Sequence, residues 1–383
     1  MGRRVAIVGA ALSDCGRVDE KTAYQLHFQA TSAALAEAGI GRHEVDGFMS
    51  HGTGMLPPIE VAEYLGLAPQ VRYIDSTGVG GSSWEIFLEH AVAAISEGLV
   101  DTVVLSYGST ARADLKRRRR RANLSFGNSG PLQFEAPFGH TLIAKHAMAA
   151  RRHMHEFGTT IEQLAEIAVS ARYNAQFNPQ AYYRDPITIE DVQSSPMIAD
   201  PFTKLHCCIR SDGGGAVVLT HEARARDCAS TPVWVLGTGE AISHATMSEW
   251  ADFTESPCVR SGQLAFDRAG VRPEDIDVVE VYDSFTLTVL LTLEGLGFCK
   301  KGEGGAFVED GKLRVGGALP TNTDGGGLSA CQPGMRGIFL MVEAVKQLRG
   351  ECGDRQVPDA RLACVNATGG WISSTGTAIL GRE

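Results

Sequence analysis

A stretch near the start of the chain recurs in the second half, and this repeat limits the folds that are open to the sequence. AEAGIGRHEVDGF at 36–48 matches DRAGVRPEDIDVV at 267–279 as a helix end, a capping glycine, a polar turn and the start of a strand. A short apolar strand precedes each copy, VAIVG at 5–9 and VWVLG at 233–237. Two matches in the same order indicate an internal duplication.

This alternation of strands and helices predicts an α/β protein in which helices cover parallel or mixed sheets. Because 383 residues exceed what one small core needs, we expect two halves, residues 1–225 and 226–383. The first half carries extra sequence from about 108 to 200, in which residues 142–157 and 161–177 have the pattern of amphipathic helices. We interpret this extra sequence as a helical insertion that covers the first half.

Composition excludes several classes of protein. The chain has 44% hydrophobic and 21% charged residues, as globular proteins do, and its apolar runs are too short to span a membrane. A net charge of −10 argues against nucleic-acid binding. The nine cysteines have neither CxxC nor Cys/His zinc spacing, so we expect no metal site, and reduced thiols in a cytoplasmic protein.

A glycine-rich loop, NTDGGGLSACQPGMRG, occupies residues 322–337 and leads into the helical stretch IFLMVEAVKQLRG. Its three consecutive glycines allow the backbone to approach a bound group closely. Cys331, Gln332 and Pro333 stand where we expect this helix to begin, and a helix N-terminus favours the thiolate form of Cys331. Cys331 is therefore either a nucleophile or acid/base group, or a small packed residue.

The loop resembles the Asn-Gly-Gly…His-Pro loop of the thiolase superfamily, with Gln332 at the position of the catalytic histidine. ITIEDVQSSPMIADPF at 187–202 and EVYDSFT at 280–286 are similar to the lipid-transfer-protein and sterol-carrier-protein-X type, and most of all to bacterial steroid side-chain aldolases. The resemblance covers nearly the whole chain. It implies a thiolase-like fold, in which two duplicated βαβ halves form a layered α-β-α-β-α core.

Thiolases carry a catalytic cysteine at the start of a helix, and this chain departs from that pattern. The matching segment, STGVGGSSWEIFLEHAVAAISEG, has Gly81 at the cysteine position. The second thiolase cysteine falls at Thr368 and Gly369. The resemblance implies that amides at these two corners stabilise an enolate or thioester oxygen. The thioester-binding candidates are Gly81, Ser82, Ser83, Asn322, Gly369 and Gly370.

Tyr282 is the best acid/base candidate, because it directly follows the apolar strand IDVVEV and sites in α/β folds gather at strand ends. The steroid aldolases have a Tyr-Asp pair that Tyr282 and Asp283 match. Asp283 would either orient Tyr282 or cap the following helix. The aldolases also have a second functional tyrosine near the glycine loop, where this chain offers Cys331 or Gln332. Gln332 can orient a carbonyl or a water but cannot carry a proton at neutral pH.

Three functional hypotheses follow from the resemblance. The first is an acyl-CoA carbon–carbon lyase, in which Tyr282 removes a β-hydroxyl proton and a retro-aldol step shortens the side chain of a steroid or a similar lipid or aromatic acid. The second is a retro-Claisen acyltransferase with Cys331 or Ser82 as an unusual nucleophile. The third is a non-catalytic acyl-CoA-binding or scaffold subunit. None of them needs a bound cofactor, and the coenzyme A thioester is the substrate or ligand.

The resemblance also implies partners. Thiolase-fold proteins are usually homodimers, and the aldolase-type members depend on a small OB-fold protein with a zinc ribbon. Because this chain has no zinc spacing, that module would come from another polypeptide. The basic run KRRRRR at 116–121 is either a solvated loop or a surface for the phosphates of a CoA-type substrate or for an acidic partner.

Overall fold

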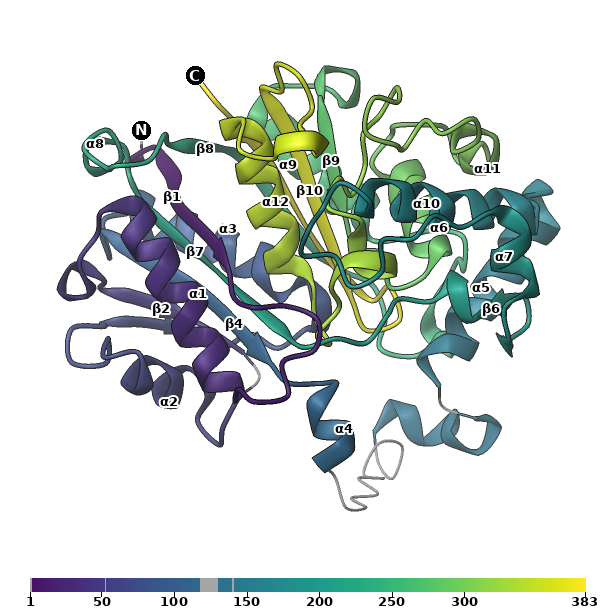
Figure 1. Ribbon diagram of the computed structural model, residues 1–383, viewed down its shortest axis with the longest axis horizontal. Helices are drawn as coiled ribbons and strands as arrows, with labels where there is room; N and C mark the ends of the chain where they lie inside the picture. Colours follow the sequence, from purple (N-terminus) through teal and green to yellow (C-terminus); the bar gives the residue numbers. More distant parts are fainter. Residues whose placement is uncertain (1, 52, 118–129, 140) are drawn as a thin grey trace.

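The computed structural model describes residues 2–51, 53–117, 130–139 and 141–383. Within these ranges one mixed sheet has the strand order β3-β2-β4-β7-β1-β8-β11-β10-β9 (Figure 1). A separate pair, β5 and β6, is antiparallel. The strands are β1 (Val5–Leu12), β2 (Gly47–Met49), β3 (Tyr73–Asp75), β4 (Thr102–Ser109), β5 (Met197–Ala199), β6 (Phe202–Thr203), β7 (Gly213–His221), β8 (Val233–Ile242), β9 (Val278–Val281), β10 (Leu362–Gly369) and β11 (Ser374–Gly381).

The helices of the described ranges connect these strands and cover the sheet. None of them combines the length and apolar character that a bilayer crossing requires. They are α1 (Ala23–Ala38), α2 (Pro57–Tyr64), α3 (Ser83–Ser96), α4 (Ala113–Arg117), α5 (Leu142–Phe157), α6 (Ile161–Ala175), α7 (Ile189–Ser194), α8 (Glu222–Ala225), α9 (Cys258–Ala269), α10 (Thr286–Gly295), α11 (Gly304–Phe307) and α12 (Gly337–Arg349).

The two halves of the sheet repeat one order, which confirms the duplicated fold. From the centre outward the strands run β1-β7-β4-β2 on one side and β8-β11-β10-β9 on the other. In each half a helix follows the central strand, α1 after β1 and α9 after β8. Gly39 ends α1 with φ 67° and Gly270 ends α9 with φ 69°, the left-handed conformation in which glycine is favoured.

The helices form three layers around the two half-sheets. Helix α1 packs on β1, β4 and β7, and α9 packs on β8 and β11, so each covers an outer face. Helices α3 and α12 each contact strands of both halves and therefore lie between them. Figure 1 shows α1 over the first half-sheet and α12 beside β10. This is the layered α-β-α-β-α core expected from the sequence, and its centre buries Trp84, Phe87 and Phe339.

The insertion is helical, but the prediction that it covers the first half is wrong. Helices α5 and α6 pack against α10 of the second half, and α6 also contacts the glycine loop at Gly326–Ala330 (Figure 1). The reason is that Leu164 and Ile167 of α6 share an apolar cluster with Leu287 of α10. Of the basic run, only its first two residues belong to α4, and residues 118–121 lie outside the described residues.

Candidate active site

A cavity of about 530 Å³ lies where several of the predicted site residues meet. Its lining comes from both halves and from the insertion. The predicted residues among its walls are Gly81, Tyr282, Gln332, Gly369 and Gly370. The other lining residues are Gly80, Ala111, Thr141, Leu142, Ile143, Cys207, Cys208, Ile209, Arg210, Ser284, Phe285, Gly334, Met335, Thr368 and Trp371.

Two glycine corners, at residues 80–81 and 369–370, touch at one side of the cavity. Gly80 has φ 83° and Gly370 has φ 64°, so both turns use a conformation that side chains disfavour. A Cβ at Gly80 would lie 3.0 Å from both the Gly369 Cα and the Gly370 N. Glycine is therefore required for the two corners to meet with bare backbone at the cavity.

The ring of Tyr282 fills the space that a side chain at position 81 would need. A Cβ at Gly81 would lie 2.3 Å from Tyr282 Cε2 and 2.4 Å from the Thr368 carbonyl oxygen. Tyr282 directly follows β9, and its side chain is only 5% exposed. A cysteine at position 81 and this placement of Tyr282 therefore exclude each other.

Tyr282 and Gln332 form a buried pair across the cavity wall. Gln332 Nε2 donates a hydrogen bond of 2.9 Å to Tyr282 Oη, and the Gln332 backbone N donates one of 2.8 Å to Ser211 Oγ. The Gln332 Oε1 atom has no hydrogen-bond partner among the described residues. Burial raises the pKa of the Tyr282 phenol, while the Gln332 amide acts in the opposite direction because it stabilises the phenolate.

Asp283 fastens the glycine loop. Its carboxylate accepts hydrogen bonds from the backbone N atoms of Gly327, at 2.7 Å, and Leu328, at 2.9 Å, and lies 3.5 Å from Arg336 Nε. Burial raises the pKa of Asp283, and the charge of Arg336 opposes that shift. The helix-cap alternative is wrong, because α10 has Phe285 as its N-cap and no side chain caps it.

Three predicted site residues are absent from the described cavity lining and instead form hydrogen bonds next to it: Ser82, Ser83 and Asn322. Ser82 Oγ lies 2.9 Å from Ser374 Oγ, and Ser83 Oγ donates a hydrogen bond of 2.8 Å to the Gly80 carbonyl. Asn322 Oδ1 accepts a hydrogen bond of 2.8 Å from the Val281 N. These side-chain atoms bond to neighbouring strands and turns, and the contact of the three residues with a thioester stays a prediction.

Cys331 is buried, which fits its packed alternative, but its predicted place at a helix N-terminus is wrong. Helix α12 begins at Gly337 instead of near Pro333, since Gly334 has φ 103° and makes a turn there. Cys331 is not among the described lining residues of the cavity, and its Sγ lies 3.2 Å from Ser211 Oγ. Burial raises the pKa of this thiol, but hydrogen bonds from Cys15 and Ser211 and the charge of Arg336 lower it overall.

Other lining residues were not singled out from the sequence. Cys207 and Cys208 line the cavity, and burial raises the pKa of each thiol to about 12. Trp371 is held by a hydrogen bond of 2.9 Å from its Nε1 to the Ala245 carbonyl and by the Lys145 ammonium 4.1 Å from its ring centre. Its position directly after Gly370, in a predicted corner, is the signal that could have identified it.

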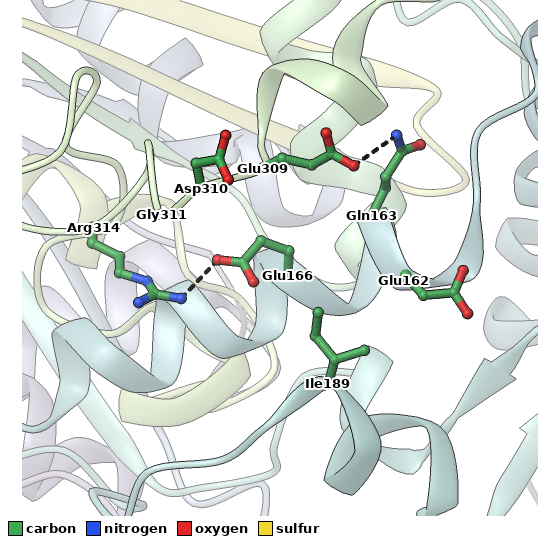
Figure 2. A pocket seen from close by; sticks show the side chains of 8 residues that line it. All are labelled: Glu162, Gln163, Glu166, Ile189, Glu309, Asp310, Gly311 and Arg314. Carbon is green, nitrogen blue, oxygen red and sulfur yellow. Dashed lines mark hydrogen bonds and ion pairs between the residues drawn. The ribbon is translucent and has the colours of Figure 1, made fainter.

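A second hollow of about 370 Å³ lies on α6 and shares no lining residue with the cavity (Figure 2). It is mainly acidic, but Arg314 pairs with Glu166 at 2.8 Å and Gln163 donates to Glu309 at 3.1 Å. In the part of the chain that the structure describes, no group of His, Cys, Asp and Glu side chains is arranged to hold a metal ion.

Comparisons with known proteins agree with this fold. Residues 239–382 match the family described as thiolase C-terminal domain-like. The chain is 33% identical to an acetyl-CoA acetyltransferase of Methanothermobacter thermautotrophicus, over 99% of this chain and 100% of that protein. It is 35% identical to a steroid side-chain-cleaving aldolase of Thermomonospora curvata, over 90% of each chain. A solved structure, the Ltp2-ChsH2(DUF35) aldolase, superposes with a TM-score of 0.89 at 32% identity, covering 99% of this chain and 98% of that one.

These observations define the class of protein. It has a layered, thiolase-like α/β fold, and its cavity lies at two glycine corners. The chain belongs to the thiolase superfamily, in its sterol-carrier-protein-2-thiolase-like group. The family resemblance seen in the sequence is thereby confirmed, and so is the prediction of an enzyme of this superfamily.

Proposed function

We propose that the chain cleaves the bond between Cα and Cβ of a β-hydroxyacyl-CoA by a retro-aldol reaction. The observation that carries this proposal is the contact of Gly81 with Tyr282, because a phenol fills the space of a side chain at position 81. A reaction that uses an acid/base group and bare backbone amides, without a covalent nucleophile, fits this arrangement.

In the proposed step, Tyr282 Oη acts as the phenolate and takes the proton of the β-hydroxyl group. The oxygen electrons form a carbonyl, the Cα–Cβ bond breaks, and its electron pair passes to the thioester as an enolate. The backbone of Gly81, Gly369 and Gly370 stabilises the enolate oxygen. The proton then moves from Tyr282 to Cα. The products are an aldehyde or ketone and a shortened acyl-CoA, and neither water nor free CoA is consumed.

The environment of Tyr282 sets the pH dependence of this step. Because burial raises its pKa, the phenolate is scarce at neutral pH, but it is a strong base once it forms. The hydrogen bond from Gln332 Nε2 is the described contact that stabilises the phenolate. The value of kcat/KM should therefore rise with pH through the neutral range.

The cavity walls support a bulky apolar acyl group. Several of the lining side chains are apolar, and they exclude water from the reacting atoms, which strengthens each electrostatic contact there. Among the described lining residues only Arg210 carries a charge, and it suits an anionic part of coenzyme A. The steroid-cleaving activity in the relative's name supports a steroid or a similar lipid or aromatic side chain as the acyl group.

The proposed enzyme is a homodimer that works with a small OB-fold protein carrying a zinc ribbon. Such a partner is supported by the similar solved aldolase, whose name pairs Ltp2 with ChsH2(DUF35). The homodimer rests on the family resemblance. We expect the partner to be needed for full activity in the cytoplasm.

Acyl transfer is the second candidate, favoured by the similar acetyl-CoA acetyltransferase and by two thiols in the cavity. Cys207 and Cys208 are the thiols concerned, and burial keeps both protonated at neutral pH. Ser82 and Cys331, the nucleophiles considered from the sequence, are not among the lining residues. These observations make acyl transfer less consistent with the geometry than the lyase.

The deciding experiment compares two substrates, 3-hydroxy-3-phenylpropanoyl-CoA and its 3-keto analogue, with and without free CoA and with and without the zinc-ribbon partner. Benzaldehyde and acetyl-CoA formed without free CoA support the lyase. Strict dependence on free CoA with the keto substrate would establish acyl transfer instead. No turnover of either substrate with the partner present would leave a binding or scaffold subunit.

The Tyr282→Phe variant then tests the assigned base. It should lose turnover while its thermal unfolding and circular dichroism match those of the parent. Tyr183→Phe is the matched control, because this tyrosine lines a different hollow and should leave turnover unchanged. Full turnover in Tyr282→Phe would reject the role of the phenol.

A further inference from the structure

Glu85 of α3 is a buried carboxyl group without a hydrogen-bond partner among the other residues that the structure describes. Its side chain is 1% exposed, and neither carboxyl oxygen has a hydrogen-bond partner in another described residue. A buried carboxyl normally pairs with a cation or a donor, since leaving it unpaired is costly. Its position one helical turn beyond Gly81 makes this group relevant to the active site.

The Glu85 side chain lies between α12 and β11, which approach it from two sides. A Cβ at Gly337, the first residue of α12, would lie 2.5 and 2.9 Å from the two Glu85 oxygens and 2.6 Å from the Gly81 carbonyl oxygen. On the other side, a Cβ at Gly376 of β11 would lie 2.5 Å from Glu85 Cβ. The carboxyl, the Gly81 carbonyl and the start of α12 therefore converge on one point.

No described charged group compensates a negative charge on Glu85. On α3, Glu89 is paired with Arg268 at 2.6 Å. Ahead of α12, Arg336 is committed to Asp324 at 2.5 Å and to Asp283. Strands β10 and β11 carry no charged side chains. Burial therefore raises the pKa of Glu85, to about 8, and the group is neutral at pH 7.

We propose that Glu85 is a positioning residue, whose neutral carboxyl group lies between the start of α12 and the Gly81 carbonyl and holds Gly81 against Tyr282. In this form the carboxyl has a proton that it can donate to the Gly81 carbonyl oxygen. A carboxylate instead repels the Gly81 oxygen. Since Gly81 packs directly on the Tyr282 ring, a shift of Gly81 displaces the phenol.

The inference deepens the proposed function and rests on Tyr282 as the acid/base group. It predicts two opposing effects of pH on kcat/KM, a rise from the phenolate and a decline above about pH 8 when Glu85 ionises. The decline belongs to Glu85 alone. It can therefore be removed without removing the rise.

The test measures kcat/KM from about pH 6 to 10 for the full chain with its partner, in Glu85→Gln and Glu85→Leu. Glu85→Gln keeps a neutral polar group, so it should retain activity at pH 7 and lose the alkaline decline. Glu85→Leu has the volume but no polar atom, so it should lose activity about tenfold or more at every pH. The matched control is Glu89→Gln, one turn further along α3, which should keep the parent profile.

A second measurement separates this inference from the reaction itself. With 3-fluorotyrosine in the chain, the ¹⁹F resonance of Tyr282, assigned by its loss in Tyr282→Phe, should move near pH 8 in the parent and stay fixed in Glu85→Gln. An alkaline decline that survives in Glu85→Gln, or a resonance that moves equally in both proteins, would overturn the assignment. A failure of the lyase assay alone would leave this resonance test intact.

Discussion

Adding one methyl group at position 81 tests the packing on which the proposed chemistry depends. The Cβ of Gly81→Ala would lie 2.3 Å from Tyr282 Cε2, 2.6 Å from Tyr282 Cζ and 2.4 Å from the Thr368 carbonyl oxygen. Thr368 is paired with Thr375 in the sheet, so its backbone cannot easily yield. Overpacking of this kind costs about 1–3 kcal/mol of the free energy of unfolding.

The cost at position 81 should depend on Tyr282. In a Tyr282→Ala background the ring is gone, and the alanine at 81 should be cheaper by about 1 kcal/mol or more, which a double-mutant cycle in urea measures. Gly41→Ala is the control, because the nearest atoms to its Cβ belong to the movable His43 side chain. If Gly81→Ala unfolds at the parent's urea concentration and the cycle shows no coupling, the ring does not pack on Gly81.

Three further changes test neighbouring parts of the site. Asp283→Asn should lower the free energy of unfolding by about 2–4 kcal/mol in urea, because an amide removes the negative charge that faces Arg336 and leaves one loop N–H without its acceptor; equal stability would show that the carboxylate does not hold the loop. The pKa of Glu85 is 4.5 in the unfolded chain and about 8 in the folded one, so between these pH values only the unfolded chain has lost the proton. The free energy of unfolding of the parent therefore falls as pH rises through this window. Relative to the parent, Glu85→Gln should therefore gain about 1.4 kcal/mol per pH unit across that window, measured by urea unfolding, and a constant difference would contradict the buried neutral carboxyl. Trp371→Ala should lower kcat/KM about tenfold more for a phenyl-bearing than for a methyl-bearing β-hydroxyacyl-CoA, and equal losses would remove its contact with the acyl group.

Local patterns in the sequence predicted the parts of this molecule that local forces determine. The amphipathic stretches at 142–157 and 161–177 became α5 and α6, because helix caps and apolar periodicity act over a few residues. Likewise Tyr282 lies directly after β9, since a run of apolar residues that ends in a polar pair marks a strand end. The two glycine corners were located through the thiolase resemblance, and Gly80 and Gly370 suit them because few other residues adopt their backbone angles.

Local patterns could not predict the contacts between distant segments. The sequence does not show that α6 packs on α10, because an apolar helix face fits any apolar surface until the chain's path is known. It also gave no reason to single out Glu85, since an isolated glutamate on a helix is usually solvated. Only the approach of α12 and β11 from either side buries that carboxyl. The partners of Asp283 and Cys331 were equally hidden, because each comes from a separate loop.

Steric exclusion between position 81 and Tyr282 restricts the chemistry of this site. A thiol at position 81 would occupy the volume of the ring, so one packing cannot hold both a cysteine nucleophile there and this phenol. Restoring a thiolase-type nucleophile therefore requires two changes together, a cysteine at 81 and a smaller residue at 282. A single Gly81→Cys substitution would damage packing without creating acyl transfer.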